Sequence, residues 1–452
     1  MAQPRPFILN APLTTVMWQL SWPAILAMVL YGLNAFMDVV FVGQLLDASA
    51  LAAVSIAYPL STLTLSFGAL IGTGGAAVLS IAIGEEDRDT QEALIAQVNT
   101  WSLVFGAACT SLGLLFARPL LASMGATGAI LDDAVLYFQI TSIGAVFWIH
   151  GLALNFVVRG EGKMKTAAAL MSVGLLLNLI LTPVLIVYGG MGVDGAAWAS
   201  NAGMLTYSIV GLRYFAKGHS TFAAAPFSLG WAPALTRKIL TTGLPGLIVA
   251  VMGVVQAFVV FNVVADFGER DLAVYAAASR IQLFLMTPLF GLMRALQPVV
   301  GINYGAGQIK RVREAFWVFT RAGLILIAPF WLFITAFPEL TFRLALPELP
   351  LSADDLLHLR VFMLVLPGLP LVFMAITFFP AIGRPAFASI VGLARQVVFY
   401  IPVMLLLPLV IGIGGVYYGA TAIDLVLVAV TGFYVVRTLR NLSPAKAAAP
   451  SA

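Results

Sequence analysis

The sequence has few of the residues that carry charge, form disulfides or bind metals. Only 10% of its 452 residues are charged, against about a quarter in an ordinary soluble domain. The single cysteine, Cys109, excludes a disulfide within the chain. The three histidines, His150, His219 and His358, are far apart and form no metal-ligand spacing. We therefore expect neither a metal site nor a water-soluble domain.

Motifs for covalent or nucleotide chemistry are also missing. No glycine-rich loop ends in Gly-Lys-Ser/Thr, and the segment Gly160-Glu-Gly-Lys-Met-Lys fails that spacing. No nucleophile and base are grouped, as an enzyme would need. The net charge of +4 is not gathered on one aromatic-bearing domain, as nucleic-acid binding would require. We expect no enzyme activity, no cofactor, no direct use of ATP and no nucleic-acid partner.

Long apolar runs dominate what is present, since 61% of the residues are hydrophobic. A membrane-spanning helix needs about 20 apolar residues, whereas a spanning β-strand would give alternating segments of about ten. The pattern therefore predicts an all-α membrane protein of about twelve transmembrane helices. The expected spans are residues 15–42, 51–83, 95–117, 133–158, 166–189, 192–214, 239–265, 272–302, 315–337, 357–382, 386–410 and 413–436.

The basic residues between these spans predict the orientation of the chain. Loops facing the cytoplasm carry the excess of Lys and Arg in multi-pass proteins. With the N-terminus inside, the cytoplasmic side holds the larger set and the opposite side a smaller one. We therefore expect both termini in the cytoplasm. The larger set is Arg5, Arg88, Arg159, Lys163, Lys165, Arg213, Lys217, Arg237, Lys238, Lys310, Arg311, Arg313, Arg384, Arg437, Arg440 and Lys446, and the smaller is Arg118, Arg270, Arg343 and Arg360.

The two halves of the chain resemble each other at a nearly constant offset. Pro23 pairs with Pro245 at an offset of 222, and Leu51-Ala-Ala-Val-Ser-Ile-Ala pairs with Leu272-Ala-Val-Tyr-Ala-Ala-Ala at 221. An even number of spans in each copy makes the copies parallel, a known arrangement in transporters. We predict two parallel, pseudo-symmetric six-helix bundles, residues 1–214 and 239–452, joined by a cytoplasmic linker at 215–238.

Several motifs resemble those of the multidrug and toxin extrusion (MATE) family, most closely its DinF-like branch. They are Met37-Asp-Val-Val-Phe-Val-Gly, Ala50-Leu-Ala-Ala-Val, Asn178-Leu-Ile-Leu-Thr-Pro, Gly190-Met-Gly-Val-Asp-Gly-Ala-Ala, Gln297-Pro-Val-Val-Gly-Ile-Asn-Tyr-Gly-Ala-Gly, Ala381-Ile-Gly-Arg and Arg395. The resemblance implies a secondary active exporter of bulky amphipathic, often cationic compounds. It also implies alternating access, driven by the inward flow of protons or sodium.

Asp38 is the main candidate for coupling. A charged side chain at the centre of a span costs about 2.5–3.5 kcal/mol on insertion scales, so an acid there is a functional candidate. Asp38 is the only carboxylate well inside the apolar spans of the first half. Its position near the end of the first span also fits an ordinary interfacial residue. The resemblance implies the coupling role, because the family places its coupling carboxylate in this motif.

The resemblance extends the site to neutral polar residues on the fourth to sixth spans. Asn178 is expected to act with Asp38 in ion coupling. Related proteins carry a second Asp one turn after the Asn, where this chain has Thr182. This substitution favours proton coupling over sodium coupling. Each polar residue could instead form an ordinary interhelical hydrogen bond. Residues expected to line the site are Tyr137, Asn155, Thr182 and Ser200.

The second half has no matching acid in its first span. Its polar residues there are Gln256 and Asn262, which we expect to line the substrate path. Arg280, Arg294 and Arg395 lie in or near apolar spans, where they could snorkel, bond to carbonyls or attract anionic groups. Asp424 is a candidate partner for one of them.

The sequence therefore predicts a proton-coupled multidrug exporter, with sodium as the alternative ion. We expect it in the inner membrane of a cell as a monomer whose partners are membrane lipid and small amphipathic molecules. The rival interpretation is a flippase for lipids or glycan precursors, which would need a basic cavity. The positions of the three arginines separate the two: arginines facing the centre favour the flippase, and arginines paired with neighbouring helices favour the exporter.

Overall fold

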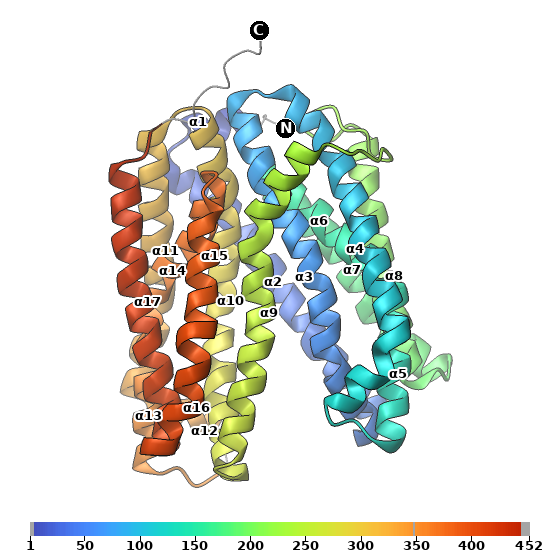
Figure 1. The fold of residues 1–452 in the computed structure, drawn as a ribbon, viewed down its shortest axis with the longest axis vertical. Helices are drawn as coiled ribbons and strands as arrows, with labels where there is room; N and C mark the ends of the chain where they lie inside the picture. Colours follow the sequence, from blue (N-terminus) through green and yellow to red (C-terminus); the bar gives the residue numbers. More distant parts are fainter. Residues whose placement is uncertain (1–3, 347–348, 444–452) are drawn as a thin grey trace.

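The computed structural model describes residues 4–346 and 349–443, which form helices and no strands (Figure 1). The last basic residue of the orientation argument, Lys446, lies outside the described residues, as do the extreme ends of both predicted bundles. The helices are α1 (Pro4–Asn10), α2 (Leu13–Leu45), α3 (Ala48–Glu85), α4 (Arg88–Ser123), α5 (Gly128–Ile143), α6 (Ala145–Gly160), α7 (Met164–Pro183), η1 (Val184–Tyr188), α8 (Gly192–Ala216), α9 (Pro233–Ala265), α10 (Glu269–Gly305), α11 (Ile309–Ala336), α12 (Pro338–Ala345), α13 (Ala353–Met363), η2 (Leu366–Gly368), α14 (Leu369–Ala381), α15 (Pro385–Leu393), η3 (Ala394–Tyr400), α16 (Ile401–Ile411) and α17 (Gly414–Arg440).

The predicted twelve-helix layout is confirmed. Within the described residues, ten helices are long and apolar enough to cross a membrane, and the bent α5–α6 pair makes an eleventh. The twelfth is α8, which is 25 residues long and carries Asp194 and Asn201 among its apolar residues. The chain is thus a multi-pass membrane protein. Most helices extend a few residues beyond the predicted spans, because polar residues such as Asp47 and Asp87 cap helix starts outside the apolar run.

The fourth span of each half is interrupted, and in the first half it is sharply bent. The α5–α6 pair bends by 53° at Gly144, where the sequence predicts one continuous helix. Asn201 of α8 compensates for the break: its Nδ2 donates to the Ile140 carbonyl (2.5 Å), and its Oδ1 accepts from Trp148 Nε1 (2.9 Å). In the second half, the short turn η2 between α13 and α14 begins at Leu366, 222 residues after Gly144.

The two halves meet closely at one end of the molecule. This is the end at which α1 begins and α17 finishes, called here the terminal end (Figure 1). There α3 packs against α9 at Gly74 and Gly243, and a Cβ added at Gly243 would lie 1.8 Å from the Leu70 carbonyl oxygen. A Cβ at Gly84 would lie 2.3 Å from the Ile302 carbonyl oxygen of α10. We call these contacts the glycine seal.

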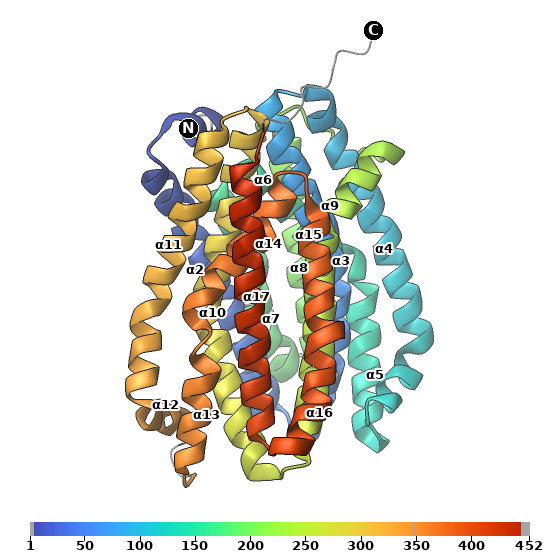
Figure 2. The same cartoon turned by 60° about the vertical axis from the view of Figure 1, so that its left-hand side comes forward.

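Toward the opposite end, called here the distal end, the halves diverge (Figures 1 and 2). The distal parts of α2, α9 and α10 carry large apolar side chains that are mostly exposed: Phe36 is 63% exposed, Phe258 65% and Phe284 75%. A Cβ added at Gly253 of α9 would meet no atom within 4 Å, in contrast to Gly243 of the same helix. The seal is therefore confined to the terminal end.

Two segments lie across the terminal end. The guanidinium of Arg5 on α1 donates to the carbonyls of Ile83 (3.0 Å) and Gly84 (3.2 Å) in the first half. Arg311 of α11, in the second half, donates to the carbonyls of Ile8 and Ala11 at 2.8 and 2.9 Å.

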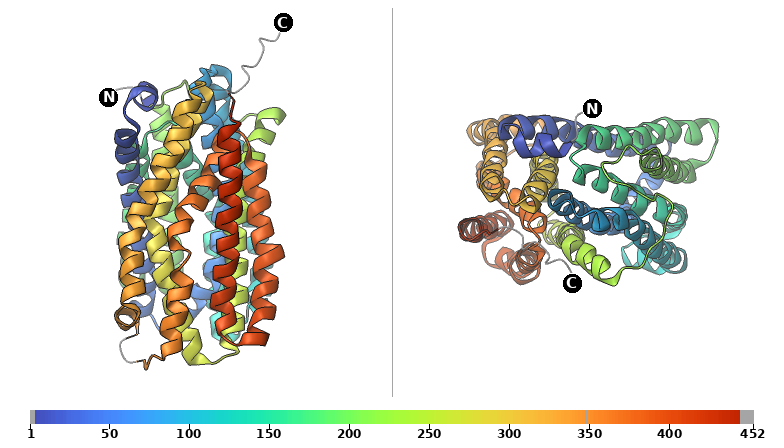
Figure 3. Two further views of the ribbon diagram at one scale, coloured as in Figure 1. Left: turned by 90° about the vertical axis from the view of Figure 1, so that its left-hand side faces the viewer. Right: turned by 90° about the horizontal axis from the view of Figure 1, so that it is seen from above.

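The linker covers 217–232, shorter than the predicted 215–238, because α8 runs to Ala216 and α9 begins at Pro233. Viewed from above, the yellow-to-red helices gather on one side and the green and teal ones on the other (Figure 3).

Candidate functional site

Asp38 lies on α2, half-buried, one helical turn after Asn34. The two side chains share one face of the helix because residues four apart are neighbours there. Asn34 donates from Nδ2 to the side-chain oxygen of Asn178 on α7 at 2.7 Å. The contact between α2 and α7 thus brings the predicted Asp38 and Asn178 into one cluster. Asn34 was not predicted, although its spacing from Asp38 is a signal that the sequence offers.

The amide of Asn178 can be placed in two orientations with different partners. With the oxygen toward α2, it accepts from Asn34, and Nδ2 lies 3.2 Å from Ser200 Oγ. With the amide turned over, its nitrogen donates to Asp38 Oδ1 at 3.2 Å, and its oxygen accepts from the Ser200 hydroxyl and backbone N–H. The nitrogen then lies 2.7 Å from the Asn34 side-chain nitrogen, so the Asn34 amide has to turn over as well and accept from it. A carboxylate at Asp38 needs a donor, whereas a protonated Asp38 offers one. The preferred orientation of Asn178 therefore depends on the charge of Asp38.

Thr182 completes this group one turn further along α7. Its hydroxyl donates to the Asn178 carbonyl at 2.9 Å and lies 3.5 Å from the Asn178 side-chain nitrogen. The side chain is buried, with 1% of the residue exposed. The structure thus brings Thr182 and Ser200 to Asn178, with a neutral hydroxyl at position 182. The cluster holds one carboxylate.

Tyr137 of α5 also lies near the cluster. It is buried, and Asp38 and Ser200 are among its neighbours. Tyr58 of α3 is near both Tyr137 and Tyr31, and Tyr31 lies about two turns before Asp38 on α2. Tyr31 and Tyr58 were not predicted, since a tyrosine in an apolar run looks like any aromatic packing residue. The neighbours of the acid thus include neutral amides, hydroxyls and phenols.

Asn155 is not brought into this cluster. Its Nδ2 donates to the Ala167 carbonyl at 2.7 Å, which ties α6 to the start of α7 near the terminal end. In the second half, Asn262 is exposed and donates to the Phe258 carbonyl of its own helix at 2.7 Å. These two predicted residues therefore lie away from Asp38.

Gln256 belongs to a separate cluster around Arg395. Arg395 donates to Asp424 Oδ1 from Nε at 2.8 Å and from Nη2 at 2.6 Å. Its Nη1 donates to Gln256 Oε1 at 3.2 Å, and Gln396 donates to the same oxygen at 2.6 Å. The π-helical turn η3 places Arg395 and Gln396 on α9's side of the bundle. Asp424 thus partners Arg395, as one of the alternatives drawn from the sequence anticipated.

The cluster around Asp38 holds a single acid among neutral polar groups. Within the described residues, no three His, Cys, Asp or Glu side chains are grouped to hold a metal ion. A single carboxylate with neutral amide and hydroxyl neighbours can take up and release a proton. Its hydrogen-bond partners rearrange when it does so, because an acid and a carboxylate need opposite partners.

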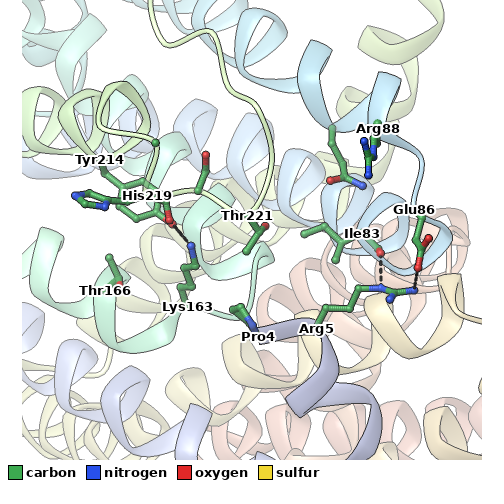
Figure 4. Close-up of a pocket in the computed structure, with 13 residues that line it drawn as sticks. Pro4, Arg5, Ile83, Glu86, Arg88, Lys163, Thr166, Tyr214, His219 and Thr221 are labelled. Carbon is green, nitrogen blue, oxygen red and sulfur yellow. Dashed lines mark hydrogen bonds and ion pairs between the residues drawn. The ribbon is translucent and has the colours of Figure 1, made fainter. Parts of the chain in front are cut away.

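A hollow of about 890 Å³ lies at the terminal end, apart from this cluster (Figure 4). Arg5 pairs with Glu86 there (2.7 Å), and Lys163 donates to the His219 carbonyl. Behind it, the fully buried Glu161 side chain accepts from Thr221 N at 2.7 Å and pairs with Lys163 at 3.3 Å. Burial raises the pKa of Glu161, and Lys163 opposes that rise. These contacts hold the linker against the first half.

Comparison with known proteins identifies relatives along the whole chain. The MatE family model matches residues 23–184 and 245–406. The two matched segments begin 222 residues apart and end 222 residues apart, as the predicted repeat requires. The chain is 25% identical to an FAD transporter of Shewanella oneidensis over 450 residues, covering 97% of each chain. It is 23% identical to the multidrug export protein MepA of Staphylococcus haemolyticus, covering 94% of this chain and 93% of that one.

Solved structures show the same fold. A MATE transporter in the bent conformation superimposes with a TM-score of 0.91 at 23% identity, covering 98% of each chain. A transporter described as the outward-facing conformation of a multidrug resistance MATE family member gives a TM-score of 0.89, again at 23% identity and 98% coverage of each chain. The resemblance that the motifs predicted is confirmed.

Proposed function

The chain belongs to the MatE family, and from this premise we propose that it is a proton-coupled secondary exporter of amphipathic, often cationic compounds. It is a transporter of the multidrug efflux type, like the relatives named for multidrug export and resistance. The proposal adds the coupling ion, the antiport with substrate and the alternating-access cycle. It also assigns the protein no enzyme activity and a monomeric state.

The observation that carries the proposal is the contact between Asp38 and Asn178. Asp38 is the one carboxylate of its cluster, and the Asn178 amide lies 3.2 Å from it in an orientation that its charge selects. Proton uptake at Asp38 removes the charge that a cationic substrate would neutralise. The proton and the substrate therefore compete for one site, which is what exchange requires. The neutral Thr182 beside Asn178 supports protons over sodium as the coupling ion.

The arrangement of the halves supports alternating access. We place the terminal end in the cytoplasm, since most of the basic loop residues lie there. The glycine seal then closes the cytoplasmic side, and the divergence of α2, α9 and α10 opens toward the outside. This assignment corresponds to an outward-facing state in the inner membrane. The exposed Phe36, Phe258 and Phe284 offer an apolar aromatic surface to an amphipathic substrate.

Of the three arginines that separate the two interpretations, Arg395 is paired with Asp424, so its charge offers little to an anionic head group, which supports the exporter. Arg280 is exposed, and Arg294 lies where the halves join without a carboxylate within 4.0 Å among the described residues, as the flippase would require. We prefer the exporter because of the Asp38 cluster. Asn178, Thr182, Ser200 and Tyr137 remain assigned to the coupling site around Asp38. We place Gln256, Asn262 and Asn155 outside that site.

The test is transport of ethidium into liposomes that hold the purified protein, under an imposed pH gradient and then under a sodium gradient. We expect movement driven by the pH gradient in the wild type and its loss in Asp38→Asn. Asp266→Asn is the matched control, because Asp266 is exposed at the distal end of α9 and should transport normally. Equal ethidium transport in Asp38→Asn and wild type would refute the coupling role. Transport driven only by sodium would refute the choice of ion.

A further inference from the structure

Two arginines from opposite halves meet at one aromatic ring. Arg159 lies at the terminal end of α6 in the first half, and Arg294 lies on α10 in the second. Their guanidinium carbons are 5.1 and 5.0 Å from the centroid of the Phe156 ring. Both positive charges are therefore held in the region where the halves join.

Neither arginine is compensated within the part of the chain that the structure describes. Arg159 Nη1 and Arg294 Nε are buried without a hydrogen-bond partner. Arg159, only 3% exposed, has one weak contact, from Nη2 to the Met171 sulfur at 3.7 Å. No carboxylate lies within 4.0 Å of either arginine among the described residues, whereas Arg395 has Asp424. The contact with Phe156 is a weak substitute for a counter-ion.

The surroundings of the pair are those of an anion site. Tyr207 is buried, its hydroxyl has no partner among the described residues, and it lies near both arginines. Tyr31 of α2 also lies near Arg294. A guanidinium presents a planar fork of N–H donors that matches phosphate and carboxylate oxygens, and a phenol adds one more donor. The unsatisfied groups of Arg159, Arg294 and Tyr207 are donors, except for the phenol lone pairs, and the Asn155 side-chain oxygen, one turn before Arg159 on α6, is an acceptor without a partner among the described residues.

Two like charges in a region of low dielectric are costly unless a counter-charge joins them. Arg294 remains partly exposed, which leaves a side from which a ligand can approach. Arg280 lies two heptads earlier on α10, on about the same face, and is exposed, so it can attract an anion toward the pair. The charges at the junction thus favour an anion.

We propose that Arg159 and Arg294 form an oxyanion-binding site between the two halves, which takes a phosphate-type group together with the Tyr207 hydroxyl. The site is distinct from the Asp38 cluster. A bound oxyanion turns the repulsion between the halves into attraction and so favours the joined terminal end. The inference rests on the proposed transport function only in that the halves separate during the cycle.

The test is calorimetric titration of the purified protein with pyrophosphate in phosphatidylcholine nanodiscs. We expect binding to the wild type and a loss of affinity of about tenfold or more in both Arg294→Gln and Arg159→Gln. Arg294→Lys should bind with intermediate affinity, since it keeps the charge and loses the fork. Arg437→Gln is the matched control, because Arg437 is exposed at the end of α17 and its loss should leave binding unchanged. Thermal unfolding verifies that each variant is folded.

A second arm identifies the source of the oxyanion. The melting temperatures of the wild type and Arg294→Gln are compared in phosphatidylcholine and phosphatidylglycerol nanodiscs. Arg294-dependent pyrophosphate binding indicates a soluble solute, and Arg294-dependent stabilisation by phosphatidylglycerol indicates a lipid head group; both support the site. If neither pyrophosphate nor phosphatidylglycerol acts through Arg294, the site is refuted. The ethidium experiment tests the transport function separately. If ethidium is transported but neither pyrophosphate nor phosphatidylglycerol acts through Arg294, only the oxyanion site is refuted.

Discussion

The guanidinium of Arg395 donates through both Nε and Nη2 to one oxygen of Asp424, at 2.8 and 2.6 Å, between the η3 turn and α17. The side chains are 21% and 12% exposed. The pair also includes Gln256 of α9, so three helical segments meet at one ionic contact. Its role is to hold the second half together.

Removing one partner of this pair should destabilise the fold. Asp424→Asn leaves Arg395 without a counter-charge, and we expect a loss of about 2 kcal/mol in the free energy of unfolding, below the value for a fully buried pair. Denaturant unfolding in detergent measures it. The double variant Asp424→Asn with Arg395→Gln should lose less than the sum of the single variants, because no uncompensated charge remains. Strictly additive losses would show that the pair is not coupled.

Filling the glycine seal should open the terminal end. In Gly243→Ala the new methyl group would meet the Leu70 carbonyl oxygen at 1.8 Å, and such overpacking costs about 1–3 kcal/mol. We expect the joined state to become about tenfold less populated. Spin-label distances between α3 and α9 at that end report the change. Gly253→Ala, on the same helix with nothing within 4 Å, should leave the distances as in the wild type, and equal distances in both variants would contradict the seal.

A second carboxylate beside Asn178 should bring in sodium. In Thr182→Asp the new oxygens would lie next to the Asn178 amide, which reaches Asp38. Two carboxylates with amide oxygens form a ligand set for a hard cation, and we expect ethidium transport to become dependent on sodium. Thr182→Asn, which is similar in size and neutral, is the control. Transport by the Asp variant that remains indifferent to sodium would count against Thr182 as the determinant of ion choice.

Glu161 should make the stability of the first half depend on pH. Because burial raises its folded-state pKa, its contribution to stability is fully present below the unfolded pKa of about 4.3. It is lost as pH rises through the folded pKa. The melting temperature of the wild type relative to Glu161→Gln should therefore fall as pH rises above about 4.3. Glu92→Gln, at an exposed position of α4, should show no such trend. A difference that rises with pH would contradict the assignment.

The spans could be predicted from the sequence because hydropathy and length decide which segments cross a membrane. The break at Gly144 could not, since the run from 133 to 158 contains no proline and its scattered polar residues do not stop it from being predicted as one span. What permits the break is Asn201, more than fifty residues away, which takes up the freed Ile140 carbonyl. A contact of that kind is invisible in local sequence.

The candidate site could be predicted best at residues that are costly to place in a membrane, such as the acid Asp38. Neutral polar residues could be predicted less well. Asp38 and Asn178 lie together in the structure, while Asn155, on a neighbouring span, bonds to the start of α7 instead. Sequence spacing gives the depth of a polar residue, but the face it presents depends on packing. Arg159 looked like a loop residue and Arg294 like one of several snorkelling arginines. Only the packing of α6 against α10 places both at Phe156.

The helix interruptions at Gly144 and Leu366 lie at the repeat offset, although only the first is a sharp bend. An interruption that both copies share is most simply one that the single ancestral unit had before it duplicated. The Asp38 cluster and the Arg395–Asp424 pair, in contrast, occur in one copy each, so they arose after the duplication or were lost from one half. The interrupted fourth span of each bundle is thus the older feature. The two features that differ between the halves, the Asp38 cluster and the Arg395–Asp424 pair, are later changes.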